Sequence, residues 1–128
     1  MLVQLGALIV AIVSCANPSI MSAHVRSVTP NNGLNHYAIA IKVTNIGDLK
    51  QPGNLLQSLV VLQDGEKVGK IGLQPLGAKQ SQTVTYGFDR SVDAGAGTTN
   101  FTFMLDFNGS SGNSTSCHAG KETFQLKI

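Results

Sequence analysis

Apolar and polar residues alternate with a period of two over most of the chain from His36 onward. In residues 37–44 the odd-numbered positions are all apolar, namely Tyr37, Ile39, Ile41 and Val43. Such alternation predicts a strand with one face on a core and the other in solvent. The same pattern recurs in residues 84–88, 101–107 and 124–128. Residues 59–62 are apolar at consecutive positions, which indicates a strand in the middle of a sheet.

Turn signals separate these runs. Asp64 and Gly65 lie between two strand-like runs and predict a tight type I′ hairpin, because both residues tolerate positive φ. Gly69 interrupts the following alternation, as a β-bulge would. A first strand is expected in residues 24–30. With about seven short strands and no helix after the N-terminal segment, the pattern predicts an all-β chain, an immunoglobulin-like antiparallel β-sandwich.

The N-terminal segment has a different character. Residues 2–13 are nearly all apolar, too few to span a bilayer, which takes about 20, but enough for the core of a signal peptide. No Lys or Arg precedes them, and Asn17-Pro18 follows soon after. A buried N-terminal helix is the alternative. We expect residues 1–23 to be a signal peptide with a short tail, and residues 24–128 to be one exported domain.

Three cleavage positions would give three different mature proteins. A cut before Cys15 fits the lipobox-like run of residues 12–15 and would allow lipidation of Cys15 as a membrane anchor. A cut after Ala16 would leave Cys117 as a single cysteine, unable to form an intramolecular disulfide. A cut after Ala23 would make His24 the first residue.

Charge argues against two classes of function. Charged residues make up 12% of the chain and the formal net charge is +2, with the basic residues spread between Arg26 and Lys127. Nucleic-acid binding relies on clustered Lys and Arg, so it is not expected. Cys117 and His118 are adjacent, but neighbours on a strand point to opposite faces. With no third group to join them, neither an enzyme nor a cofactor is expected.

The histidines allow a metal hypothesis. An N-terminal His24 could chelate Cu(II) through its amine and ring, with His118 completing the site. Residues 22–33 resemble the mature start of periplasmic copper-resistance binding proteins, which are small β-sandwiches. Their motif has an aspartate two residues before the final histidine, where this chain has Ser116. The alternative is that His24, His36 and His118 are unrelated surface residues.

Other polar residues suggest modification or calcium binding. Three sequons of the form N-x-S/T occur, at Asn100, Asn108 and Asn113, and would matter only if the source glycosylates. Three aspartates could contribute to a calcium site or could simply be turn residues, namely Asp89, Asp93 and Asp106.

Three stretches carry turn motifs, namely the V-x-N-x-G-D turn of residues 43–48, the hairpin at Asp64-Gly65, and the L-x-x-x-G turn that leads into a strand over residues 73–84. Together they resemble the CARDB domain, the adhesion-related immunoglobulin-like module of bacterial and archaeal surface proteins. The resemblance covers roughly residues 25–106. It implies an immunoglobulin-like fold and a role in binding, adhesion or spacing rather than catalysis.

The main hypothesis is therefore an exported, non-enzymatic module at the cell surface or outside it, which binds a protein or a surface glycan. Membrane contact would come only through a lipid on Cys15. One alternative is the copper-binding protein. Another is a filament subunit and homo-oligomer, in which residues 17–24 pair as a strand with a neighbouring molecule. Contacts are expected at residues 45–54 and 108–116, because loops on a rigid sandwich usually carry recognition.

Overall fold

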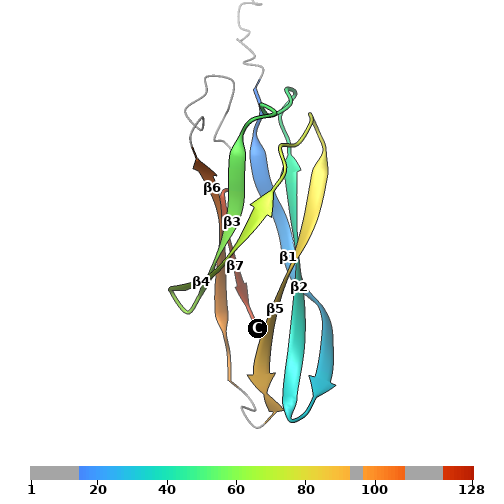
Figure 1. The fold of residues 1–128 in the computed structure, drawn as a ribbon, viewed down its shortest axis with the longest axis vertical. Coiled ribbons are helices and arrows are strands. Elements are labelled where there is room, and N and C mark those ends of the chain that lie inside the picture. The colour runs from blue at the N-terminus through green and yellow to red at the C-terminus, as the bar shows by residue number, and fades with distance from the viewer. Residues whose placement is uncertain (1–14, 93–96, 109–119) are drawn as a thin grey trace, which may run out of the picture.

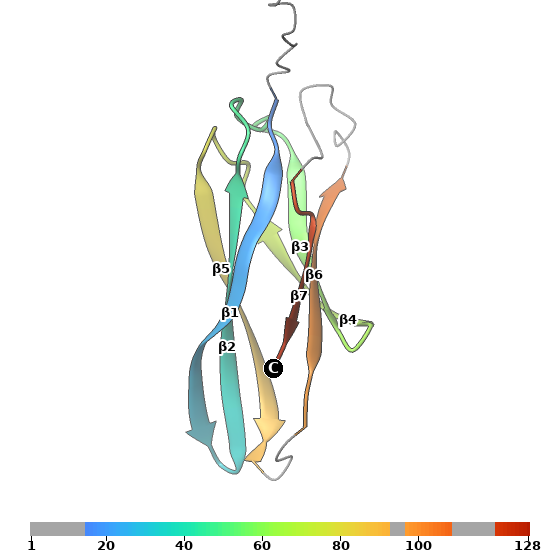
Figure 2. The same cartoon turned by 180° about the vertical axis from the view of Figure 1, so that it is seen from behind.

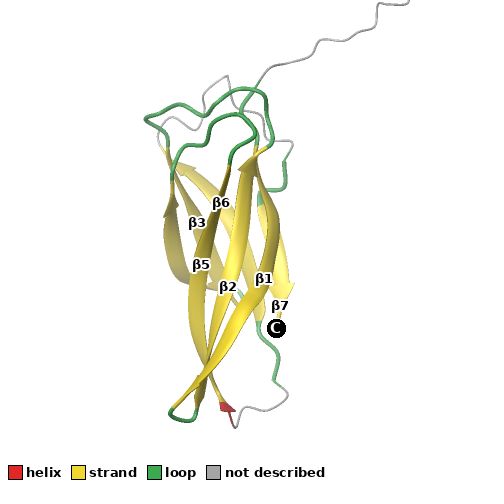
Figure 3. Cartoon of the chain, turned by 90° about the vertical axis from the view of Figure 1, so that its right-hand side faces the viewer, coloured by secondary structure: helices red, strands yellow, loops and turns green. Residues whose placement is uncertain are grey.

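Two antiparallel sheets pack face to face in the computed structural model, which describes residues 15–92, 97–108 and 120–128 (Figures 1 and 3). The first sheet has the order β1-β2-β5 and the second the order β4-β3-β6-β7. The strands are β1 (Pro18–Asn31), β2 (Leu34–Asn45), β3 (Leu56–Gln63), β4 (Glu66–Leu73), β5 (Ser81–Ser91), β6 (Asn100–Asn108) and β7 (Thr123–Lys127). The predicted immunoglobulin-like sandwich of seven strands is confirmed, and the described residues contain no α-helix.

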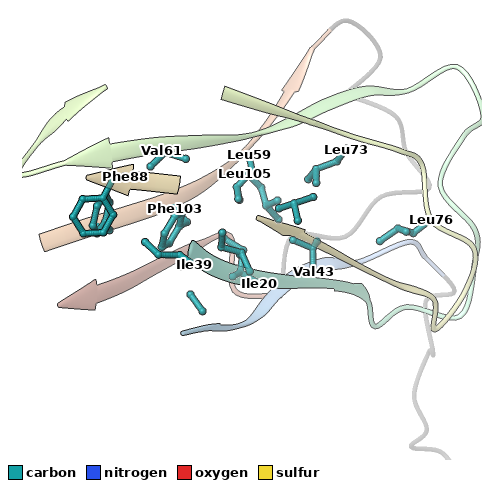
Figure 4. Packing of buried hydrophobic residues seen from close by; sticks show 14 residues of the cluster. Ile20, Ile39, Val43, Leu59, Val61, Leu73, Leu76, Phe88, Phe103 and Leu105 are labelled. Carbon is teal, nitrogen blue, oxygen red and sulfur yellow. The ribbon is translucent and has the colours of Figure 1, made fainter. Parts of the chain in front are cut away.

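The core lies between the sheets and is formed by the alternating positions that the sequence indicated (Figure 4). Its most deeply buried aromatic residues are Phe101 and Phe103, on β6. Phe101 contacts Phe88 of β5 edge-on, with ring centroids 4.7 Å apart. Burying a large apolar side chain contributes roughly 1.5–3 kcal/mol to the stability of the fold. Burial of these residues, which come from both sheets, is therefore the main interaction that holds the sandwich together.

The hairpin and bulge predicted around β4 are both present. Asp64 and Gly65 have φ angles of 50° and 89°, as a type I′ turn requires. Val61 of β3 pairs with Gly69 while Leu62 pairs with Lys67, so Val68 is the extra residue of a bulge.

The first strand begins earlier than the sequence indicated. Residues 18–23 belong to β1, and Ile20 is only 1% exposed. Two register shifts in the β1–β2 pairing leave Met21 and Arg26 as extra residues. These extra residues break the period of two. The positions on the inner face of β1 are therefore 20, 23, 25 and 28, which are three, two and three residues apart. Residues 18–23, which the sequence placed before the domain, thus form part of the first sheet.

One buried amide joins three segments at the end of the sandwich where β1 begins. Asn45 is 0% exposed. Its Nδ2 donates to three main-chain carbonyls, those of Leu49 (2.8 Å), Leu76 (3.2 Å) and Gly77 (3.2 Å). Its Oδ1 accepts from the main-chain nitrogens of Asn17 (2.8 Å) and Gly47 (3.0 Å). The side chain thus ties the start of β1 to the β2–β3 loop and the β4–β5 loop.

The glycine and aspartate of the same turn also hold residues 15–17. A Cβ on Gly47 would overlap the carbonyl oxygen of Cys15 and lie 2.8 Å from the nitrogen of Asn17. Asp48 accepts a hydrogen bond from the nitrogen of Cys15 at 3.0 Å. Asn, Gly and Asp of the V-x-N-x-G-D motif therefore have one shared task, which is to seat residues 15–17.

We expect Gly47→Ala to lower the free energy of unfolding by about 1–3 kcal/mol, because the new methyl group has no room beside the Cys15 carbonyl. Thermal unfolding followed by circular dichroism would measure this. Gly53→Ala is the matched control, since a Cβ there meets no atom within 4 Å. Equal melting temperatures for the two variants would contradict the role assigned to Gly47.

Candidate functional site

A groove of about 690 Å³ opens on the outer face of the four-stranded sheet, at the end of β3 and β4 that lies near the start of β1. Its lining comes from the β3–β4 pair and the loops next to it, and comprises Gly53, Leu55, Leu56, Gln57, Ser58, Lys70, Gly72, Leu73, Gln74 and Pro75. The groove is deepest where two residues with small side chains lie opposite each other on neighbouring strands. Ser58 pairs with Gly72, and the space beside Gly72 is open.

An exposed leucine stands at one side of this groove. Leu56 is 68% exposed, the highest value among the large apolar side chains of the described residues. Its neighbours Leu55 and Gln57 are buried. Alternation along β3 turns Leu56 outward, where it presents an aliphatic surface to whatever approaches the sheet.

A charged pair crosses the same face. Lys70 Nζ lies 3.8 Å from Asp106 Oδ2, and both side chains are nearly half exposed. Asp106 on β6 is directly opposite Ser58 in the β3–β6 register. Exposed ion pairs contribute little to stability, so both charges remain free to exchange partners with a ligand.

The floor of the groove carries an unpaired hydroxyl. Ser58 is 5% exposed, and its Oγ is buried with no hydrogen-bond partner. Leaving a buried polar group unsatisfied costs about 1–3 kcal/mol, and nearly all such groups in folded proteins are paired. Because the Oγ itself is buried, a ligand in the groove would exchange a hydrogen bond with it only after the Ser58 side chain turns toward the groove.

A pair of glutamines behind the groove keeps its end in shape. Gln51 and Gln57 exchange two side-chain hydrogen bonds, both 2.9 Å long. Gln57 also donates to the carbonyl of Gln74, and Gln51 accepts from the nitrogen of Leu76, again at 2.9 Å. The loops on both sides of the groove are thus fixed to each other, so the groove is formed before anything binds.

The histidines chosen from the sequence do not meet among the described residues. His24 is exposed in the middle of β1, opposite Ala40, and His118 lies outside the described residues. His36 makes a different contact, with its Nδ1 2.7 Å from Asp89 Oδ1. No group of three His, Cys, Asp or Glu side chains that could hold a metal occurs in the described ranges. The copper hypothesis also needs His24 as the first residue, which would remove the buried Ile20.

The aspartates considered for calcium are separated. Asp89 is on the outer face of the three-stranded sheet and Asp106 on the outer face of the other sheet, each with its own partner. Asp93 lies outside the described residues.

Cys15 is buried and disulfide-bonded. A sulfur atom in a disulfide cannot also carry a thioether lipid, so this bond and lipidation exclude each other. Of the sequons, Asn100 is exposed at the start of β6, Asn108 is the last residue of β6, and Asn113 lies outside the described residues.

Of the loops expected to carry recognition, residues 45–54 contribute little to this groove. In residues 45–54, Asn45 and Gln51 are buried, and only Gly53 lines the groove. The other expected loop, residues 108–116, lies outside the described residues except for Asn108. The sequence pattern did not predict the groove. Its one signal in the sequence is the adjacent pair Leu55 and Leu56, because a strand must turn one of two neighbouring leucines outward.

The fold is that of CARDB domains. The CARDB domain of a Pyrococcus furiosus protein, solved in complex with di-metal ions, matches with a TM-score of 0.62 and 13% identity, over 92% of this chain and 96% of that one. Its solution structure gives a TM-score of 0.57, also at 13% identity, over 90% of this chain and 94% of that one. A domain from a protein assigned to the cell surface of Methanosarcina acetivorans matches with a TM-score of 0.60 and 17% identity, over 89% and 90% of the two chains.

These structural likenesses establish the CARDB-like immunoglobulin fold and connect it with one cell-surface domain. No protein-family model and no curated protein matches the sequence. Within the described part of the chain, no helix has the length and apolar character needed to cross a bilayer.

Two buried serines provide a test of the site. We expect Ser58→Ala to leave the free energy of unfolding unchanged or to raise it by up to about 1 kcal/mol, because it removes an unsatisfied hydroxyl. Ser19→Ala should lower it by about 1–2 kcal/mol, because the equally buried Ser19 Oγ accepts from the nitrogen of Lys121 at 2.8 Å. Urea unfolding of both variants measures the difference. A Ser58→Ala loss as large as that of Ser19→Ala would mean that the Ser58 hydroxyl has a partner in the folded protein.

Proposed function

We propose that this protein is a non-enzymatic binding module, exported to the cell surface or beyond, that holds a polypeptide segment of a partner in the groove on its four-stranded sheet. The observation that carries the proposal is the combination of an exposed Leu56 with an unsatisfied, buried Ser58 hydroxyl in one preformed groove. The cell-surface assignment of one structural neighbour and the apolar residues 2–13 support the location.

The chemistry of the lining favours a polypeptide over a glycan. The lining residues contain aliphatic side chains, amides and one charge, and none of them is aromatic. Sugar-binding sites typically stack a sugar ring on an aromatic face, which this lining does not offer. A polypeptide segment supplies an aliphatic side chain to place against Leu56 and main-chain groups for the Ser58 hydroxyl. Apolar surface with a few placed polar groups is the usual composition of a specific binding site.

We assign no reaction to the protein. The contact between His36 and Asp89 lies on the outer face of the other sheet, with both side chains about half exposed. Neither residue lines the groove.

The proposal can be tested without knowing the partner. The folded protein would be used to select binders from a displayed random-peptide library and would be applied in parallel to a glycan array. We expect selected peptides to carry an aliphatic residue, and Leu56→Asp to weaken their binding at least tenfold, because a carboxylate replaces the apolar contact at the mouth of the groove. Fluorescence anisotropy with the selected peptides gives the affinities.

Val92→Asp is the matched control, because Val92 is another exposed apolar residue but follows the end of β5 in the other sheet. It should leave peptide affinity unchanged, and both variants should keep the wild-type melting temperature. Peptides that bind Leu56→Asp as well as wild type, or binding to glycans alone, would refute the proposed site.

A further inference from the structure

We propose that the mature protein keeps Cys15 and holds it in an intrachain disulfide, for which the sequence offers a single partner, Cys117. In the structure Cys15 is 7% exposed and disulfide-bonded. The chain has two cysteines, and Cys117 lies outside the described residues. This inference is independent of the groove and concerns how the protein is processed and where it matures.

The main chain at Cys15 is fixed by the fold. Its nitrogen donates to Asp48 Oδ1 at 3.0 Å, and its carbonyl oxygen accepts from the nitrogen of Leu49 at 3.3 Å. The backbone also passes so close to Gly47 that no side chain fits there. Residue 15 is therefore a seated part of the domain, whereas a residue in a disposable leader needs no such contacts.

The chain that leads into β7 lies alongside the start of β1 (Figure 2). Gly120 donates from its nitrogen to Asn17 Oδ1 at 2.9 Å, and Lys121 donates to Ser19 Oγ at 2.8 Å. The nitrogen of Ile20 donates to the carbonyl of Lys121 at 2.7 Å. The residue numbers rise together on both sides, so the two segments run in parallel.

This register agrees with the pairing of the two cysteines. The three contacts join residues that are 103, 102 and 101 positions apart, and Cys15 and Cys117 are 102 positions apart. β1 belongs to the three-stranded sheet and β7 to the four-stranded sheet. A disulfide at this position would therefore join the two sheets along the edge where β1 and β7 meet.

The bond has consequences for processing. Two thiols lose two protons and two electrons as the sulfur–sulfur bond forms, and a disulfide of an oxidising thiol-exchange system outside the cytoplasm accepts them. Leader cleavage must then occur before Cys15, and the cysteine carries no lipid. The alternative cuts after Ala16 and after Ala23 would each discard half of the bond.

The experiment is intact-mass and peptide analysis of the full chain exported to the periplasm of a bacterial host. We expect a mature species that begins at or before Cys15, takes up no alkylating reagent until it is reduced, and then takes up two equivalents. Proteolysis without reduction should yield one cross-linked peptide pair containing Cys15 and Cys117. A mature species that begins at Asn17 or His24, free thiols in the unreduced protein, a lipid mass on Cys15, or a disulfide-linked dimer would each overturn the proposal.

A stability measurement separates a structural bond from an incidental one. Cys15→Ser and the double variant Cys15→Ser/Cys117→Ser should melt on the order of 10 °C or more below the oxidised wild type, because the closed loop spans about 100 residues. Reduced wild-type protein should melt with the double variant. Equal melting temperatures for oxidised and reduced wild type would rule out a structural role. If the variants fail to fold, the mass analysis of the wild type still decides the matter.

Discussion

The buried side chain of Asn45 is the interaction on which one whole end of this sandwich depends. Its amide joins two loops by donating to the carbonyls of Leu49, Leu76 and Gly77, and each such hydrogen bond contributes about 0.5–1.5 kcal/mol to stability. One of those loops continues from Gln74 and Pro75, which line the groove. The main chain of Asn45 also bonds to Gln80 and Lys79. The start of β1 and one side of the groove thus rely on the same residue.

The opposite end is held by different chemistry. The guanidinium of Arg90 lies 5.2 Å from the ring centroid of Tyr37 and 5.8 Å from that of Phe88. It also donates to Thr99 Oγ1 at 2.7 Å and to the carbonyl of Ile128 at 2.9 Å. A cation on aromatic faces there closes the sandwich around the end of the chain. Both ends of the sandwich are fixed by side chains that point inward. The outer faces of the sheets therefore contribute little to stability and are available for recognition.

The sequence predicted the parts of the fold in which period two is unbroken. In β2, β5 and β6 large apolar residues occupy every second position over most of the strand, so the fold class and most of the core could be predicted. The first half of β1 could not, because the bulges at Met21 and Arg26 disguise the alternation of Ile20, Ala23 and Val25. At the other end of β1, the Asn32-Gly33 dipeptide is typical of a tight hairpin turn, and its φ angles are 52° and 80°. The groove depends on which residues face each other across strands, which one chain read alone does not specify.

The bulge at Val68 links the cross-strand pairing that forms the groove to the packing of the core. A regular hairpin from Asp64-Gly65 would place Lys70 opposite Leu59, toward the core, and Ile71 opposite Ser58, toward solvent. The extra residue reverses both, so that Ile71 pairs with Leu59 and packs against the core while Lys70 turns outward to Asp106. The same shift sets Gly72 against Ser58 and creates the low floor of the groove. A one-residue insertion that the core requires, to keep a lysine out and an isoleucine in, is therefore also what opens the candidate binding site.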